Sequence, residues 1–428
     1  MKVPKYFAAL AACAVLLASC VTTREKKPVP EPEIQEPEIK EKEITEPKLT
    51  EPEEKSSTQE ETEAEVPEAE MPSTEVPKGE LLLESALSQI IAEMTLEEKI
   101  AQLFVIAPEQ CPVTGGAASQ TEFTQSLKEA LARYPVGGFI FFAQNIKNPA
   151  QLKNFTRQLK EATSIPPIIA VDEEGGRVAR LANTKGFGLP VFTSMGAIGA
   201  SGDVENARKA GQLIGSYLAE YGFTLDFAPD VDVNTNPKNI VIGDRAFGSD
   251  PELVAGMAGA FLDGLHSVGV KGCIKHFPGH GDTTGDTHAD YVAVTKDWGE
   301  LKECELIPFI KNFSAADCVM IAHLSVPNIT RDGLPASLSK ELISGKLRGD
   351  LGYDGVVLTD ALNMGAIEKN YADGEAAVLA FEAGNDILLM PNDFAASYNA
   401  MLEAVKSGRI AEKCVDESVM RILLLKGL

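Results

Sequence analysis

The sequence predicts an α/β protein: a single (β/α)8 TIM barrel preceded by an acidic, proline-rich linker. Two observations predict the barrel. Beyond residue 80, eight apolar runs of strand length alternate with longer segments of helical period. Most of the runs are continuously apolar, which is typical of parallel strands buried on both faces. Because periodicity does not show whether a sheet closes on itself, an open doubly wound sheet stays as the alternative fold.

The predicted strands follow one another at intervals that suit βα units. They are residues 100–106, 138–142, 167–171, 225–233, 270–277, 318–326, 355–359 and 386–390. Helical segments lie between them, for example at 205–221 and 251–268. A barrel of this kind takes about 250 residues and grows by loop insertions, so we assign residues 85–428 to one catalytic domain. The longest intervals hold the loops 187–194 and 278–291, where we expect insertions that build a site.

Residues 1–19 have the pattern of an export signal, with two lysines before an apolar run over residues 6–18. The run is too short to span a bilayer, which takes about 20 apolar residues. The sequence Leu17-Ala18-Ser19-Cys20 resembles a lipobox, in which a peptidase cuts before the cysteine and the thiol is lipidated. We therefore expect an exported lipoprotein, anchored to a membrane through Cys20 on the periplasmic face or at the cell surface. An ordinary signal peptide with a chance cysteine is the alternative.

Residues 20–84 are predicted to be a disordered linker that begins at the lipidated cysteine. Residues 21–80 contain nine prolines, 19 acidic and 8 basic residues and almost no large apolar side chains. Such a composition cannot bury enough surface to offset the cost of ordering. Because charged, proline-rich chains stay extended, we expect a spacer that holds the barrel clear of a lipid surface, with partner binding as the alternative role.

Charge and cysteine content narrow the function classes. The 428 residues include 39 basic and 63 acidic side chains, a net charge of −24 at pH 7, which argues against a nucleic-acid partner. Five cysteines follow residue 20, an odd number without a C-x-x-C pair, so neither a disulfide framework nor a zinc site is indicated. We expect no cofactor, no metal and a monomeric protein.

Polar side chains gather directly after the predicted strands, where barrel enzymes place their chemistry. Four of the five histidines fall at such positions. The residues are Asp172, Glu173, Glu174, Arg177 and Arg180 after the third run; Asp230, Asp232, Asn234 and Arg245 after the fourth; Lys275, His276, His280, Asp282, Asp286 and His288 at or after the end of the fifth; His323 in the sixth; and Asp360 after the seventh.

Asp360 directly follows the apolar run 355–359, so a barrel would hold its carboxylate at the mouth of the site. A fixed carboxylate can attack an anomeric carbon as a nucleophile. A helix N-cap is the alternative role, because aspartate is a favoured cap.

The stretch K-H-F-P-G-H-G-D-T-T-G-D-T-H, which starts at Lys275, is far more specific. With it the chain resembles glycoside hydrolase family 3, and in particular its short single-domain β-N-acetylglucosaminidases (β-hexosaminidases), whose barrel carries K-H-F-P-G-H-G-D followed by a loop with D-S-H. Four more motifs match in order: V-D-E-E-G-G-R-V from Val171, D-F-A-P-D-V-D from Asp226, G-D-R-A-F-G from Gly243 and T-D-A-L-N-M from Thr359. The resemblance covers about residues 88–425.

The resemblance implies a retaining exo-β-N-acetylglucosaminidase that releases terminal non-reducing β-linked GlcNAc from peptidoglycan fragments or chito-oligosaccharides. By this carry-over Asp360 attacks the anomeric carbon and forms a covalent glycosyl-aspartate. His288 is the acid/base, paired with Asp286. A carboxylate on one imidazole nitrogen fixes the tautomer, so the other nitrogen can protonate the leaving oxygen and later deprotonate water.

The same resemblance implies a set of sugar-binding residues. Asp172 accepts hydrogen bonds from hydroxyl groups, while Arg180, Arg245, Lys275 and His276 supply donors around the ring; charge-assisted bonds of this kind suit a polyhydroxylated ligand. The preference for a 2-acetamido group is assigned to the Lys-His stretch and the Asp-x-His loop.

Two positions depart from the family pattern without removing a reacting group. Thr287 stands where serine is usual, and Ala361 stands where a second aspartate is frequent, which should leave Asp360 easier to ionise. The alternatives are a β-glucosidase or β-xylosidase of the same family, a GlcNAc phosphorylase, a metal-dependent hydrolase built on the residues between 276 and 288, and a non-catalytic sugar-binding lipoprotein.

Overall fold

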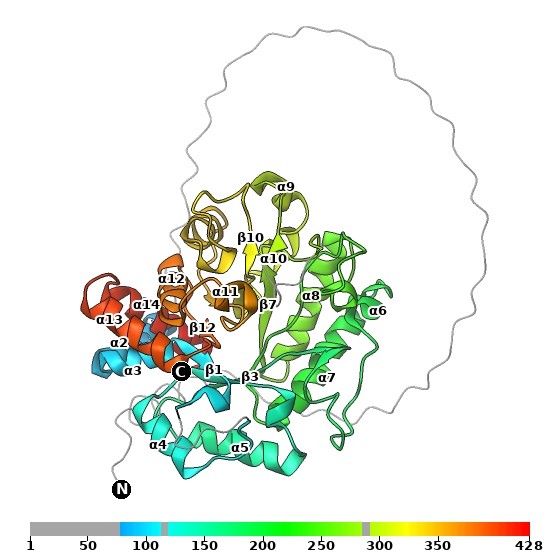
Figure 1. Cartoon of the computed structure of the whole chain (residues 1–428). Coiled ribbons are helices and arrows are strands. Elements are labelled where there is room, and N and C mark those ends of the chain that lie inside the picture. Colours follow the sequence, from blue (N-terminus) through cyan, green and yellow to red (C-terminus); the bar gives the residue numbers. More distant parts are fainter. Residues whose placement is uncertain (1–77, 113–118, 285–291) are drawn as a thin grey trace, which may run out of the picture.

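The computed structural model describes residues 78–112, 119–284 and 292–428. Eight parallel strands form the centre of the fold (Figure 1). They are β1 Phe104–Ile106, β2 Gly138–Phe141, β3 Ile168–Val171, β6 Leu225–Asp226, β7 Lys271–Phe277, β9 Cys318–Ile321, β11 Val356–Thr359 and β12 Leu388–Leu389. Each predicted run contains one of these strands, and every strand is hydrogen-bonded to the next in this order.

The sheet closes into a barrel. β12 pairs with β1, with Phe104 opposite Leu388, and a parallel bridge joins Leu358 of β11 to Ile387 just before β12. The backbone N–H of Thr359 also donates to the carbonyl of Ile387 at 3.1 Å. The predicted TIM barrel is therefore confirmed, and the open doubly wound sheet is wrong.

The fourth strand is much shorter than the predicted run 225–233. It ends at Asp226, although the Phe227 N–H still donates to the Val171 carbonyl at 2.8 Å and the Ala228 carbonyl still accepts the Cys273 N–H at 2.9 Å. The next contact is an isolated bridge between Asp230 and Lys275. Pro229 lies in this interval and has no backbone N–H to donate to a ladder. The apolar residues beyond Asp226 are still buried, which explains why they resemble a strand in the sequence.

Helices surround the barrel and join its strands (Figure 1). They are α3 Leu96–Gln102, α4 Gln125–Arg133, α5 Pro149–Glu161, α6 Met195–Gly199, α7 Val204–Glu220, α8 Pro251–His266, α9 Trp298–Glu303, α10 Ile307–Asn312, the π-helix η6 Glu341–Asp350, α11 Gly365–Glu368, α12 Asp373–Ala383, α13 Phe394–Lys406 and α14 Glu412–Leu425. α7 and α8 agree closely with the predicted segments 205–221 and 251–268. The short 3-10 helix η4 Gly243–Arg245 lies in the connection between β6 and α8.

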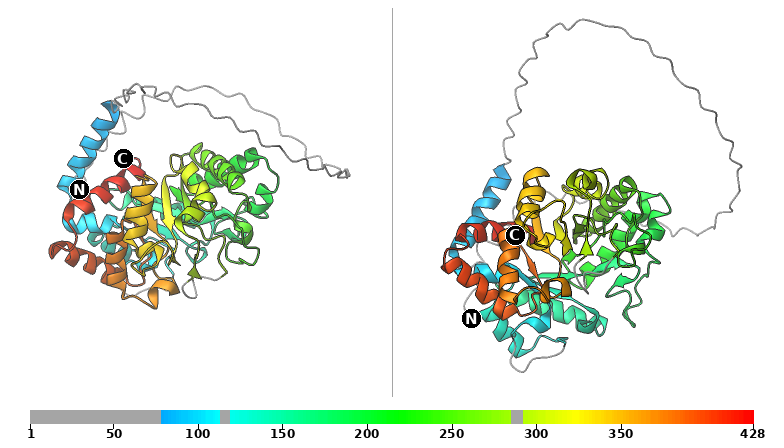
Figure 2. Two further views of the ribbon diagram at one scale, coloured as in Figure 1. Left: turned by 90° about the horizontal axis from the view of Figure 1, so that it is seen from above. Right: turned by 45° about the horizontal axis from the view of Figure 1, so that its top comes forward.

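The first described helix, α2 Lys78–Glu93, begins inside the segment predicted as linker, so the predicted boundary at residue 85 falls within a helix. Leu87, Ile90 and Ile91 recur at helical spacing and are buried, and α2 packs against α14 (Figure 2). The signal peptide, Cys20 and the linker up to residue 77 lie outside the described residues. Within the described ranges, no helix is long and apolar enough to cross a bilayer.

Candidate active site

The predicted sugar-site residues that the structure describes converge at the C-terminal ends of the strands. Asp172 follows β3, Lys275 and His276 lie near the end of β7, and Asp360 follows β11. A cavity of about 160 Å³ is lined by all of them together with Arg180 and Arg245. The two other predicted residues, Asp286 and His288, lie outside the described part of the chain.

Lys275 lies between two carboxylates at one side of this cavity. Its Nζ is 2.8 Å from Asp172 Oδ1 and 2.6 Å from Glu174 Oε1, and its side chain is 3% exposed. Burial on its own would lower the pKa of Lys275, but the charges of Asp172 and Glu174 outweigh burial and raise it. The lysine is therefore a permanently charged donor at the cavity wall.

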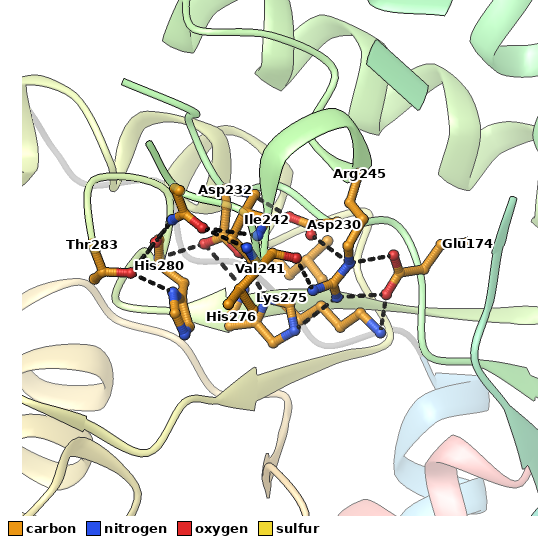
Figure 3. A network of polar contacts seen from close by, with 12 residues as sticks. Glu174, Asp230, Asp232, Val241, Ile242, Arg245, Lys275, His276, His280 and Thr283 are labelled. Atoms are coloured by element: carbon orange, nitrogen blue, oxygen red, sulfur yellow. Dashed lines mark hydrogen bonds and ion pairs between the residues drawn. The ribbon is translucent and has the colours of Figure 1, made fainter. Parts of the chain in front are cut away.

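Glu174 links Lys275 to Arg245 in this ion-pair network (Figure 3). It accepts two hydrogen bonds from Arg245, Nε to Oε2 and Nη2 to Oε1, both at 2.8 Å. Burial would raise the pKa of Glu174, but Arg245 and Lys275 outweigh it and hold the pKa well below its usual range. The sequence placed Glu174 after the third strand, in the V-D-E-E-G-G-R-V motif, without giving it a role at the sugar.

His276 is oriented by a buried carboxylate that the sequence also left without a role. Its Nδ1 lies 2.7 Å from Asp232 Oδ2, and its Nε2 lies 3.2 Å from Nη2 of Arg245. Because a guanidinium only donates, that contact requires an unprotonated Nε2, and Nδ1 then carries the proton toward Asp232. Asp232 also accepts the His280 N–H at 2.6 Å. Burial would raise the pKa of Asp232, but His276 and His280 lower it to about 2.

One group of described residues has atoms close enough to hold a metal ion: Asp230, Asp232 and His276. The guanidinium of Arg245 already lies against it, with Nε 3.4 Å from Asp230 Oδ2 and Nη2 3.2 Å from His276 Nε2. A divalent cation at this place would have to sit beside that fixed positive charge. The donor set therefore favours ion pairing over metal coordination, against a metal-dependent hydrolase at this group.

Asp360 is held as an ionised carboxylate. Its Oδ1 accepts the N–H of Ala361 at 2.7 Å, and its own N–H donates to the Ile321 carbonyl at 2.9 Å. Burial would raise the pKa of Asp360, but the nearby His323 and His276 side chains and the hydrogen bond from the Ala361 N–H together lower it. Asp360 does not cap the next helix, because the residue before α11 is Met364.

His323 supports the backbone next to Asp360. Its Nε2 is 2.9 Å from the Ala361 carbonyl oxygen and its Nδ1 is 2.7 Å from Ser337 Oγ. A carbonyl oxygen only accepts, so Nε2 carries a proton. The sequence placed His323 in a strand but did not predict that it would contact the residue after the candidate nucleophile.

Arg180 reaches the cavity from the loop after β3. Its Nη2 is 3.4 Å from Asp172 Oδ2, and its guanidinium lies over the ring of Phe142 at 5.5 Å. The buried carboxylate of Glu173 fixes this loop by accepting three backbone N–H groups, those of Arg180, Leu181 and Ala182. The cavity thus combines an ionised carboxylate at its mouth with rigid charged donors, a set that suits a polyhydroxylated ring.

Comparison with known proteins identifies the family. The protein-family model described as "Glycosyl hydrolase family 3 N terminal domain" matches residues 95–425. Beta-hexosaminidase LpqI of Mycobacterium tuberculosis is 35% identical over 351 residues, which cover 79% of this chain and 84% of LpqI. Beta-hexosaminidase A of Pseudoalteromonas piscicida is 34% identical over 339 residues, 72% of this chain but only 56% of that protein.

A solved structure agrees with these relatives. The family 3 β-N-acetylglucosaminidase from Paenibacillus sp. str. FPU-7 superposes with a TM-score of 0.73 at 39% identity. The match covers 78% of this chain and 62% of that chain. The match thus covers less than two thirds of the length of two of these three similar proteins, 56% and 62%.

Proposed function

The chain belongs to glycoside hydrolase family 3, and we propose that it is a retaining exo-β-N-acetylglucosaminidase acting on peptidoglycan fragments or chito-oligosaccharides. The observation that carries this proposal is the single cavity in which Asp360 faces Asp172, Arg180, Arg245, Lys275 and His276. The names of the similar proteins support the choice of GlcNAc over glucose or xylose.

In the proposed reaction Asp360 attacks the anomeric carbon while the bond to the leaving oxygen breaks. His288, paired with Asp286, gives its proton to that oxygen, which leaves as an alcohol. The resulting glycosyl-aspartate is then hydrolysed: His288 takes a proton from water, and the hydroxyl oxygen bonds to the anomeric carbon as the bond from that carbon to the Asp360 oxygen breaks, which restores the free carboxylate. The lowered pKa of Asp360 supports the nucleophilic role, because the attacking group must be ionised.

Substrate selection in this proposal depends on the ion-paired donors. Glu174 fixes Lys275 and Arg245, and Asp232 fixes the His276 ring beside them, so the two cationic donors meet the sugar hydroxyls without reorganising. The set lines one cavity of about 160 Å³ whose walls are buried and half-buried side chains, a size that suits one terminal ring. That supports exo-cleavage.

The proposal is tested by the initial rates of the purified chain from residue 21 on nitrophenyl β-N-acetylglucosaminide and nitrophenyl β-glucoside, each in phosphate and in phosphate-free buffer. We expect a strong preference for the acetamido sugar and a rate independent of phosphate. Equal or reversed preference would mean a β-glucosidase or β-xylosidase. A phosphate-dependent rate with sugar 1-phosphate as product would mean a phosphorylase.

We also propose that the mature protein is a monomer anchored to a membrane by a lipid on Cys20, outside the cytoplasm. The lipobox-like sequence supports the anchor. In detergent phase separation the wild-type protein should enter the detergent phase and a Cys20→Ala variant should not, whereas Cys13→Ala, inside the signal, should behave as wild type. Wild-type protein in the aqueous phase would contradict the anchor.

A further inference from the structure

A second cavity, of about 460 Å³, lies next to the sugar cavity. Both cavities are lined by Asp172, Arg180, Met320, Asp360 and Met364. The candidate nucleophile therefore lies where the two spaces meet.

Several of the groups that line the other sides of the sugar cavity are buried. Glu174, His276 and His280 are 1%, 7% and 3% exposed, and the first two are already engaged in the ion-pair network. A terminal ring in this cavity places its anomeric carbon at Asp360. The group on the far side of the scissile bond then needs space beyond Asp360, and the second cavity provides it.

The second cavity is built from the opposite half of the barrel mouth. Phe142 follows β2, Met390 follows β12, and Asn363, Glu368 and Lys369 come from the segment after Asp360 that includes α11. This segment is fixed to the barrel, since the Asn363 N–H donates to the Met390 carbonyl at 3.0 Å. α11 accordingly lies beside β12 in Figure 1.

The lining suits a second sugar unit. Phe142 and Met390 supply apolar surface for the C–H face of a pyranose ring, and Asn363 supplies an amide that both donates and accepts. The Phe142 ring is held in place, because its backbone N–H donates to Asn145 Oδ1 at 2.9 Å and its ring contacts the Arg180 guanidinium. A rigid aromatic surface costs little ordering on binding.

We propose that this second cavity is the leaving-group subsite and binds a second sugar unit, with Phe142 as its platform and Asn363 as its polar contact. The proposal rests on the proposed function, since it requires cleavage at Asp360. It makes the enzyme sensitive to what is attached to the terminal GlcNAc, and it assigns that sensitivity to residues that do not touch the GlcNAc ring.

The test compares three quantities for the full mature chain: kcat/KM on diacetylchitobiose, kcat/KM on methyl β-N-acetylglucosaminide, and the inhibition constant of free GlcNAc. For Phe142→Ala and Asn363→Ala we expect kcat/KM on the disaccharide to fall about tenfold. With Asn363→Ala, the values for the methyl glycoside and for GlcNAc, which leave the second cavity nearly empty, should stay within about twofold. With Phe142→Ala, which also removes a contact of Arg180, these two values should fall less than the value for the disaccharide. Phe142→Tyr keeps the ring and should restore the disaccharide rate.

Leu213→Ala, on the exposed side of α7, is the control for loss of an apolar side chain and should change none of the three values. Equal losses on both substrates, or weaker GlcNAc inhibition with Asn363→Ala, would overturn the proposal and assign the cavity to the GlcNAc unit itself, for example to its acetamido group. Unchanged disaccharide rates in both variants would place the leaving group elsewhere. A wild-type chain that neither cleaves the methyl glycoside nor is inhibited by GlcNAc would instead contradict the proposed function.

Discussion

Glu174 and Arg245 face each other through two hydrogen bonds of 2.8 Å, and the same carboxylate contacts Lys275 at 2.6 Å. One buried acid therefore holds two of the proposed sugar donors. Leaving buried cations without their partner is costly, on the order of 3–5 kcal/mol. We read this arrangement as preorganisation: the donors are fixed before the substrate arrives.

Replacing Glu174 by Gln should therefore reduce both stability and activity. The neutral amide keeps the volume but leaves Arg245 and Lys275 with one carboxylate fewer, so we expect a loss of about 3 kcal/mol in the free energy of unfolding in urea and a lower kcat/KM. Glu205→Gln, which breaks an exposed pair with Arg208, should change unfolding by less than about 0.5 kcal/mol. Equal behaviour of the two variants would mean that Glu174 is not a positioning residue.

Replacing Asp360 by Asn should abolish turnover while preserving sugar affinity. The amide cannot act as a nucleophile, so kcat should fall about 10³-fold or more, while the inhibition constant of GlcNAc should change little. Asp263→Asn, on the outer face of α8, serves as the control. Near-normal hydrolysis by pure Asp360→Asn protein would refute the nucleophile assignment.

His288→Ala distinguishes an acid role of His288 from a binding role. Without a proton donor, substrates with poor leaving groups suffer most, so kcat/KM should fall about 10²–10⁴-fold on diacetylchitobiose and far less on a dinitrophenyl glycoside. A uniform loss across leaving groups would instead indicate a binding role. His266→Ala is the matched control, because His266 is paired with Asp317 on the outside of the barrel.

The pH dependence of kcat/KM should change when His323 is replaced. The nearby His323 side chain helps to lower the pKa of Asp360, so in the wild type Asp360 stays ionised at pH values below the usual pKa of an aspartate. Protonation of Asp360 therefore reduces wild-type activity only at a pH below this lowered pKa. In His323→Gln the pKa of Asp360 rises, and the acid limb of kcat/KM should move to higher pH. His266→Gln should leave the limb where it is. An unmoved limb in His323→Gln would show that its contact with Ala361 serves structure alone.

Much of the fold could be predicted because its signals are local. Continuous apolar runs mark strands buried on both faces, and all eight are present in the barrel. The positions of the strand ends also predicted that Asp172, Lys275 and Asp360 lie close together, because the C-terminal ends of all strands of a parallel barrel lie at the same end of the barrel.

The features that could not be predicted from the sequence depend on contacts between residues that are far apart in the chain. Glu174 and Arg245 are 71 positions apart, and nothing in either motif shows that they pair. The end of β6 at Asp226 could not be predicted from apolar character, because the apolar residues that follow it stay buried after the strand has ended. The second cavity likewise combines side chains from β2, β9, β12 and the segment after β11, which no single motif contains.

The packing of α7 on α8 provides a final prediction, concerning stability. A Cβ on Gly211 would lie 2.1 Å from the carbonyl oxygen of Phe261, so Gly211→Ala must push the helices apart, at a cost of about 1–3 kcal/mol in the free energy of unfolding. Gly256, which lies in α8, is the matched control: a Cβ on it would meet Val204 Cγ1 at an ordinary 3.6 Å. Gly256→Ala should stabilise the helix by about 0.5–1 kcal/mol. Urea unfolding of both variants measures the difference, and a Gly211→Ala protein as stable as Gly256→Ala would show that α7 and α8 do not pack this closely in solution.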